Sequence, residues 1–155
     1  MIKPYRGTRT LRNLRATGAA VINLTDDILL FAQAALGDPR PPTRHATAID
    51  GAVLADACSW REVAVDAIEG RGPRARVKTR VVARGVGREF IGPNRAAAAV
   101  LEASILASRA RRLPAGEIRA ELARLEVAVD KTAGPRERAA WERVLWHVRA
   151  AADDG

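Results

Sequence analysis

The side chains that could do chemistry gather near the start of the chain, at Pro4-Tyr5-Arg6-Gly7-Thr8-Arg9-Thr10. A threonine at a helix start can cap an unpaired first-turn N–H group, and the N-terminal end of a helix attracts anions. Arginine adds charge-assisted, often paired hydrogen bonds to phosphate oxygens. The stretch therefore predicts a phosphate-binding loop at a helix start. The plain alternative is a capped helix whose arginines are solvated.

The elements that must position this loop follow directly. Gly18 suits the left-handed residue at the end of a short helix. Residues 19–24 then read as a buried strand, and Thr25-Asp26-Asp27 starts a second short helix that reaches about residue 36. The segment 38–45 holds three prolines and is expected to be an irregular surface loop, with His45 in solvent.

Strand patterns continue through the middle of the chain. Residues 51–54, 60–69 and 74–84 favour strands, and the turn Gly70-Arg71-Gly72-Pro73 separates the last two. Basic and small residues alternate over 74–84, which predicts an antiparallel strand with one wet face. Together with residues 19–24, these segments are expected to form one compact antiparallel sheet.

The period changes to that of helices after Gly92-Pro93. We expect one helix over residues 95–112, a second after Pro114 and a third that reaches about residue 152. Their apolar stripes predict a small three-helix bundle, with the tryptophans in its core and His147 partly buried. Asn94 is a suitable N-cap, and Arg95 beside it could face a ligand. The sequence thus divides into an α+β part, residues 1–92, and a helical part, residues 93–155.

Composition limits the function classes. The 155 residues carry a net charge of +8, 48% hydrophobic residues, two histidines and a single cysteine, Cys58. No apolar run reaches the ~18 residues of a membrane span, and no Walker loop, dinucleotide glycine motif or zinc motif is present. Cys58 is expected to be a buried core residue. The chain is expected to be cytoplasmic. Nucleic-acid binding is a weak alternative, because the arginines are spread along the chain and aromatic residues are scarce.

Several of these pieces together resemble a known superfamily. The pattern Thr10-x-x-Asn13-Leu14-x-x-x-Gly18-x-x-x-Ile22-Asn23 is similar to the phosphate loop, helix and strand of flavin-reductase-like, FMN-binding split β-barrels. The whole chain resembles an uncharacterised branch of that superfamily, a domain of unknown function with a helical C-terminal extension. The matching pieces are residues 4–10, residues 21–27, Asn94-Arg95-Ala96 and Asp130-Lys131-Thr132-Ala133-Gly134.

The resemblance implies a fold, a cofactor and an assembly. The fold would be an antiparallel split β-barrel followed by three helices. The barrel would be incomplete, because the family's upstream hairpin is missing before Met1-Ile2-Lys3. The cofactor would be FMN, and the protein would be a homodimer with the flavin near the subunit interface. The residues implied in cofactor binding are Arg6, Thr8, Arg9, Thr10, Asn13, Asn23, Asn94 and Arg95.

The resemblance leaves the reaction open. An FMN-dependent oxidoreductase is the leading interpretation, since the chain offers a phosphate cradle without an evident catalytic set and a flavin carries its own redox chemistry. The branch is also associated with organisms that use methanopterin-linked one-carbon chemistry, so a role in tetrahydromethanopterin biosynthesis is a hypothesis. The alternative is a non-enzymatic accessory protein that keeps the fold without the flavin.

Overall fold

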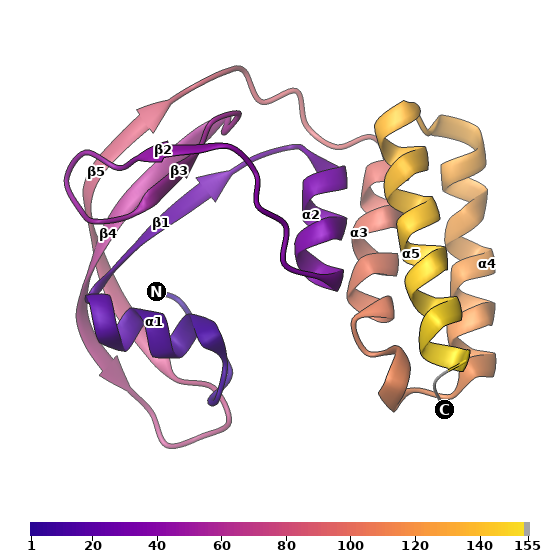
Figure 1. Ribbon diagram of the computed structural model, residues 1–155, viewed down its shortest axis with the longest axis horizontal. Coiled ribbons are helices and arrows are strands. Elements are labelled where there is room, and N and C mark those ends of the chain that lie inside the picture. The colour runs from indigo at the N-terminus through magenta and orange to yellow at the C-terminus, as the bar shows by residue number, and fades with distance from the viewer. Residues whose placement is uncertain (154–155) are drawn as a thin grey trace. The chain divides into compact units, whose positions relative to one another are not determined.

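The computed structural model describes the backbone of residues 1–153 and the side chains as far as residue 152. The chain forms two compact units (Figure 1). The first contains residues 1–25 and 41–90, and the second contains residues 26–40 and 91–155. Residues 26–40 therefore pack with the helices that follow residue 90, and the units do not follow a single cut in the sequence.

The first unit is built on two antiparallel sheets. One has the strand order β1-β4-β5, formed by Ala19–Leu24, Ser59–Glu69 and Arg76–Val86. The other pairs β2 (Thr43–His45) with β3 (Ala52–Leu54). The prediction of an α+β fold with antiparallel sheets is confirmed, but within the described residues these strands do not close a barrel.

Two details of the sheet prediction were wrong. Residues 51–54 do not join the main sheet, because β3 pairs with β2 instead. The segment expected to be irregular contains β2, since its prolines end at Pro42 and leave the N–H groups of residues 43–45 able to pair. The carbonyl of Pro42 extends this hairpin by accepting from Ala55 N at 2.9 Å.

Helix α1 (Arg9–Thr17) lies on the main sheet, and the two together form the apolar core of the first unit. Leu11 and Leu14 are 2% and 3% exposed and pack with Ala75 and Val77. Gly18 ends the helix in the left-handed conformation, with φ 64°, as the sequence predicts. The loop before α1 is held as well, because the backbones of Ile2 and Val77 exchange two hydrogen bonds of 2.9 Å. Both ends of α1 are thus fixed to the sheet.

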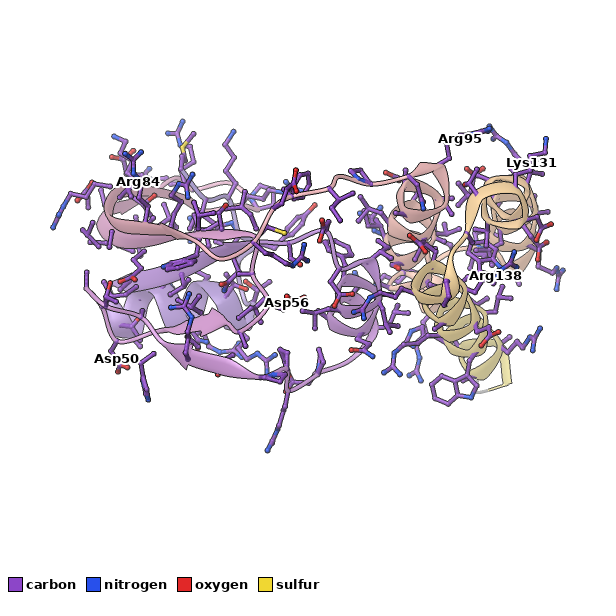
Figure 2. The ribbon with its side chains drawn as sticks, turned by 90° about the horizontal axis from the view of Figure 1, so that it is seen from above. Asp50, Asp56, Arg84, Arg95, Lys131 and Arg138 are labelled. Atoms are coloured by element: carbon purple, nitrogen blue, oxygen red, sulfur yellow. The ribbon has the colours of Figure 1, made fainter. Side chains whose placement is uncertain are left out.

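The alternation expected over residues 74–84 is present in residues 76–80 of β5 and breaks after Arg80, since Val81 is 57% exposed. Arg76, Lys78 and Arg80 are exposed, whereas Val77 is fully buried. Lys78 forms an ion pair with Glu69 at 2.8 Å, and Arg80 forms one with Asp66 at 3.1 Å. Arg84, near the end of the same strand, is also exposed (Figure 2). Exposed ion pairs of this kind add only about 0–1 kcal/mol each to the stability of the fold, so this face of the sheet is mainly a solvated surface.

The described residues of the second unit form four α-helices. They are α2 (Ile28–Leu36), α3 (Arg95–Ala107), α4 (Ala115–Thr132) and α5 (Pro135–Asp153), with the short 3-10 helix η1 (Ala110–Arg112) between α3 and α4. The three expected C-terminal helices are therefore present, and α2 packs with them. Their shared core includes Ala32, Val100, Leu122, Trp141 and Val144.

Two helical predictions were wrong. The helix expected over residues 95–112 ends at Ala107, where backbone bonds change to the tighter pattern that leads into η1, such as Arg112 N to Arg109 O at 2.8 Å. Trp146 is 65% exposed, although the tryptophans were expected in the core. Trp146 stands two residues past Val144 and so lies on another face of α5 than Trp141 and Val144, which are buried as predicted. His147 is half-buried, as expected.

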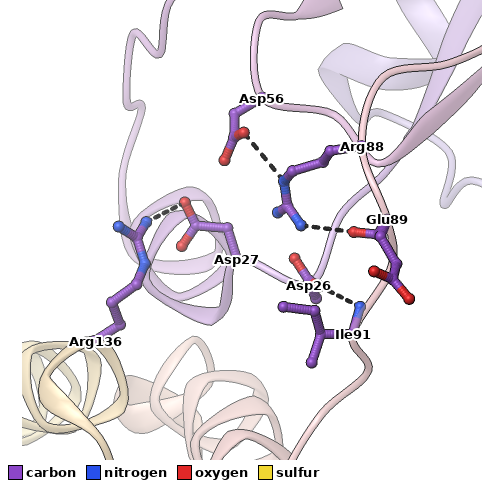
Figure 3. A network of polar contacts seen from close by, with 7 residues as sticks. All are labelled: Asp26, Asp27, Asp56, Arg88, Glu89, Ile91 and Arg136. Atoms are coloured by element: carbon purple, nitrogen blue, oxygen red, sulfur yellow. Dashed lines mark hydrogen bonds and ion pairs between the residues drawn. The ribbon is translucent and has the colours of Figure 1, made fainter.

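Asp27 fixes the start of α2 within this unit. Its carboxylate accepts from Leu30 N at 3.1 Å and from the guanidinium of Arg136 on α5 (Figure 3). Burial tends to raise the pKa of Asp27, but the Arg136 and Leu30 bonds outweigh it and hold the pKa below its ordinary value. The predicted helix start at Thr25-Asp26-Asp27 is confirmed, and its acid also ties α2 to α5.

Asn94 provides the first test. Its side chain accepts from Ala97 N at 2.8 Å and donates to Glu137 Oε1 at 3.0 Å and Thr132 O at 3.3 Å. We expect Asn94→Ala to lower the free energy of unfolding by about 1–2 kcal/mol, the usual cost of a lost N-cap. Urea unfolding followed by circular dichroism measures this. Arg95→Ala, the adjacent exposed residue, should change it by less than about 0.5 kcal/mol. Equal effects of both substitutions would contradict the capping role.

Candidate cofactor-binding site

An open pocket of about 400 Å³ lies in the first unit between α1 and β1. Three residues predicted for the cofactor, Arg9, Thr10 and Asn13, line it together. The opposite wall is the backbone and side chains of residues 19–22, and Asp50 and Gly51 close one side. The remaining lining residues are Ile2, Leu14 and Thr17.

The spacing on α1 explains why these side chains meet. Leu11 and Leu14 turn toward the sheet and are buried. Positions three and four apart share a helix face, so Thr10, Asn13 and Thr17 form one polar stripe beside that buried face. Arg9 stands four residues before Asn13 and lies at the same end. The pocket is thus polar along α1 and apolar along Val21 and Ile22 of β1.

Thr8 shapes the loop that leads into α1. Its hydroxyl accepts from Leu11 N at 3.4 Å and donates to Tyr5 O at 2.8 Å. The expected capping role is therefore present. Gly7 adopts φ 81°, a left-handed conformation that suits glycine, so the loop can turn sharply just before the cap. A contact between Thr8 and a cofactor stays a prediction.

Arg6 is occupied by the protein itself. Its Nε donates to Gly72 O at 2.9 Å, and its terminal nitrogen donates to Gly70 O. Both carbonyls belong to the turn between β4 and β5. Arg6 therefore fastens the loop to the sheet, and it is absent from the pocket lining. Its contact with phosphate stays a prediction.

Asn23 also has a structural partner on each side of its amide. Oδ1 accepts from Leu54 N at 3.0 Å, and Nδ2 donates to Ala52 O at 3.3 Å. The side chain thus links β1 of the main sheet to β3 of the hairpin. This link places the hairpin, and with it Gly51, next to β1.

The two remaining predicted residues belong to the second unit. Asn94 caps α3 and uses its amide within that unit, as described above. Arg95 is the first residue of α3 and is exposed (Figure 2). The pocket lining includes neither residue. Their role toward a cofactor stays a prediction.

Glu62 is the important residue that sequence reasoning missed. Glu62 lies on β4 and is 0% exposed, and backbone N–H groups satisfy its buried carboxylate. Ala48 N donates to Oε2 at 2.6 Å, and Thr47 N donates to Oε1 at 3.0 Å and to Oε2 at 3.1 Å. Thr47 Oγ1 and Trp60 Nε1 complete the set at 3.0 and 3.3 Å. The Thr47 and Ala48 N–H groups outweigh burial and lower the pKa of Glu62 from its ordinary 4.5 to about 2. Glu62 is therefore a charged anchor for the loop of residues 46–51.

This loop delivers Asp50 and Gly51 to the pocket. A Cβ at Gly51 would lie 2.9 Å from Val21 Cγ2, so only glycine allows the loop to approach β1 so closely. Trp60 supports the anchor, because its ring lies against Gly85, where a Cβ would come within 2.0 Å of the indole. Arg44 covers the ring with its guanidinium 4.2 Å from the centroid. A period of two, which places Trp60 and Glu62 on one face of β4, is the sequence pattern that could have revealed them.

A neighbouring hollow of about 300 Å³ shares Asp50 and Gly51 with the pocket. Its other lining residues are Thr43, Arg44, His45 and Ala52. His45 is exposed at the end of β2, as expected. The loop held by Glu62 thus borders both spaces. On the same unit, Arg88 ties the end of the sheet to Asp56 at 3.0 Å (Figure 3).

Comparison with protein families places the chain. The N-terminal domain of the DUF447 family of proteins of unknown function matches residues 1–88, and the second DUF447 model matches residues 94–145. Together they cover most of the sequence. The chain therefore belongs to the DUF447 family.

Solved structures show the fold. An FMN-bound DUF447 protein from Methanosarcina mazei aligns with a TM-score of 0.84 and 20% identity, over 94% of this chain and 80% of that one. An NADH:FAD oxidoreductase from Streptomyces globisporus aligns with a TM-score of 0.48 and 13% identity, over 59% and 68% of the two chains. The styrene monooxygenase flavin reductase of Pseudomonas putida gives 0.44 and 19%, over 55% and 57%. Only the first similarity is strong enough to define the fold. The family resemblance is thus confirmed.

Among the described residues, no helix is both long and apolar enough to cross a membrane. Cys58 is 2% exposed, which confirms its expected place in a core.

Glu62 yields a second test. In Glu62→Gln, amide N–H groups meet the backbone donors of Thr47 and Ala48, so we expect the midpoint of thermal unfolding at pH 7 to fall by roughly 5 °C or more. Because the folded-state pKa is depressed, the stability that Glu62 contributes is present above about pH 4.5 and is lost as the pH falls toward 2. The difference between wild type and variant should therefore shrink over that window. Asp66→Asn, an exposed acid on the same strand, is the control, and a pH-independent difference would contradict the charged anchor.

Proposed function

We propose that this protein binds FMN in the pocket between α1 and β1. The observation that carries the proposal is the meeting of Arg9, Thr10 and Asn13 in one pocket. These residues supply a guanidinium, a hydroxyl and an amide at the N-terminal half of a helix, which is a favourable set for a phosphate. The FMN-bound relative with the same fold supports the choice of ligand.

The pocket suits a ligand that is polar at one end and apolar at the other. Its polar wall is α1, and its apolar wall includes Val21, Ile22 and Ile2. Its volume of about 400 Å³ falls in the usual range for small-molecule sites, roughly 300–1,000 Å³. A phosphate on α1 would leave a flat aromatic ring against β1.

The proposed activity is that of a flavin-dependent oxidoreductase. When bound, the flavin supplies electron or hydride transfer, and the protein supplies binding and orientation. Arg9, Thr10 and Asn13 would hold the phosphate. Asp50 is the one acid among the described residues that line the pocket, and its position is set by the loop that Glu62 anchors. A carboxylate at this place can accept a hydrogen bond from a polar group of the ligand.

A homodimer is part of the proposal. Ile22 and Leu24 are 40% and 42% exposed and share one face of β1. Leu24 and Val86, which is 80% exposed, lie in the same cross-strand row on either side of Ser59. Exposed apolar residues gathered in this way favour an interface. Since Ile22 also lines the pocket, a second copy on this face would border the flavin.

Other features remain predictions of the sequence and its resemblance. They are the cytoplasmic location, the link to tetrahydromethanopterin or one-carbon metabolism, and the role of an accessory protein without flavin.

The FMN site is tested by titration. We expect the purified chain to bind FMN more tightly than riboflavin, because riboflavin lacks the phosphate. Arg9→Ala with Thr10→Ala should weaken FMN binding by at least about 10-fold, since one charged hydrogen bond contributes about 1.5–3 kcal/mol. Quenching of flavin fluorescence measures both affinities.

Arg15→Ala is the matched control for this experiment. It removes an exposed arginine from the last turn of α1, outside the pocket lining, and should leave the affinity for FMN unchanged. Equal binding of FMN and riboflavin would contradict a phosphate on α1. Absence of FMN binding would favour the accessory role. Binding to DNA or RNA that falls steeply with salt would instead favour the nucleic-acid alternative.

The dimer is tested by sedimentation. We expect wild type to sediment as a dimer and Leu24→Lys to shift it toward monomer, because a charge would have to be buried in the interface. Lys3→Ala changes a charge at an exposed position away from that strand face and serves as control. A wild-type monomer at high micromolar concentration would rule out the assembly.

A further inference from the structure

A cavity in the helical unit has no role in the proposed flavin site. Its volume is about 570 Å³, and it is lined by η1, the first turns of α4 and the last turns of α5. Its apolar lining includes the half-buried Val148 and Ile118, which is 3% exposed. Four alanines complete this surface, at positions 110, 115, 151 and 152.

Three arginines give the cavity its charge. Arg111 comes from η1, Arg119 from α4 and Arg149 from α5. No acidic side chain is among the described residues that line the cavity. Within the described part of the chain, neither Arg119 nor Arg149 forms an ion pair or a side-chain hydrogen bond. Three arginines thus line a space whose other described lining residues are apolar.

This arrangement limits the chemistry of a ligand. Arg119 and Arg149 line one space from two helices, and an anion between two like charges lowers their repulsion. Guanidinium groups match the geometry of carboxylate oxygens and can bind them through two hydrogen bonds. A small inorganic anion would leave the apolar surface of Val148 and the four alanines exposed to water. An organic anion with a short apolar chain would cover it.

We propose that this cavity binds a small amphipathic carboxylate. The carboxylate lies between Arg119 and Arg149, with Arg111 also in the lining, and the apolar chain lies along Val148 and the alanines. Ala115, at the positive end of the α4 dipole, adds to the favourable field for a negative charge. The site is independent of the flavin pocket, because the two pockets have no lining residue in common.

Octanoate is the probe for this site. Isothermal titration calorimetry of the full chain should detect octanoate binding, whereas acetate, which lacks the chain, and 1-octanol, which lacks the charge, should each bind at least about 10-fold more weakly. Arg119→Ala with Arg149→Ala should weaken octanoate binding at least about 10-fold. Arg138→Ala removes an exposed arginine from the first turns of α5, outside the cavity, and should leave the affinity unchanged (Figure 2).

The readouts separate this site from the flavin site. Circular dichroism should show that the double variant keeps its helices, because both arginines are exposed. Its affinity for FMN should match that of wild type, so failure of one proposal leaves the other standing. The proposal is overturned if octanoate does not bind or if 1-octanol binds as well as octanoate. It is also overturned if the double variant and Arg138→Ala behave alike.

Discussion

The buried carboxylate of Glu62 is the constraint on which the candidate site depends. None of residues 46–51 is fully buried, so packing alone would hold them only weakly against the sheet. A carboxylate that accepts from two successive backbone N–H groups fixes both their position and their direction. Because the charge is buried, it is tolerated only while these bonds are made. The loop is therefore held in one arrangement, and Asp50 and Gly51 arrive at a defined place beside β1.

Other polar side chains do the same work elsewhere in the first unit. Arg6 fastens the loop before α1 to the turn after β4, and Asn23 ties β1 to the backbone of β3. Each satisfies main-chain groups that no sheet ladder reaches. The pocket thus lies beside a small apolar core of α1 and β5, and polar side chains hold the segments around it in place. The side chains of Arg9, Thr10 and Asn13 line the space itself.

Local chemistry explains what could be predicted from the sequence. The cap at Thr8, the left-handed Gly18 and the bounds of β1 depend on residues that are close in the chain. The stripe on α1 follows from helical spacing, so the grouping of Thr10 with Asn13 was predictable. Strand β2 was missed because the prolines just before it favour an irregular loop, and because its partner β3 lies several residues further along the chain. The partners of Arg6, Asn23 and Glu62 are distant or follow an irregular loop, and no periodicity encodes them.

The predicted cofactor residues differ in the partners that their side chains have within the protein. A guanidinium that already donates to two carbonyls, as Arg6 does, has fewer donors left for a phosphate, and Arg6 must release the β4–β5 turn to offer them all. An amide with both ends bonded to β3, as in Asn23, gains nothing by exchanging those bonds for a ligand. Residues that shape a site and residues that touch a ligand therefore compete for the same polar atoms. In this fold the two tasks fall to different residues. Arg6 and Asn23 bond to main-chain groups, and the stripe of Thr10, Asn13 and Thr17 on α1 lines the pocket.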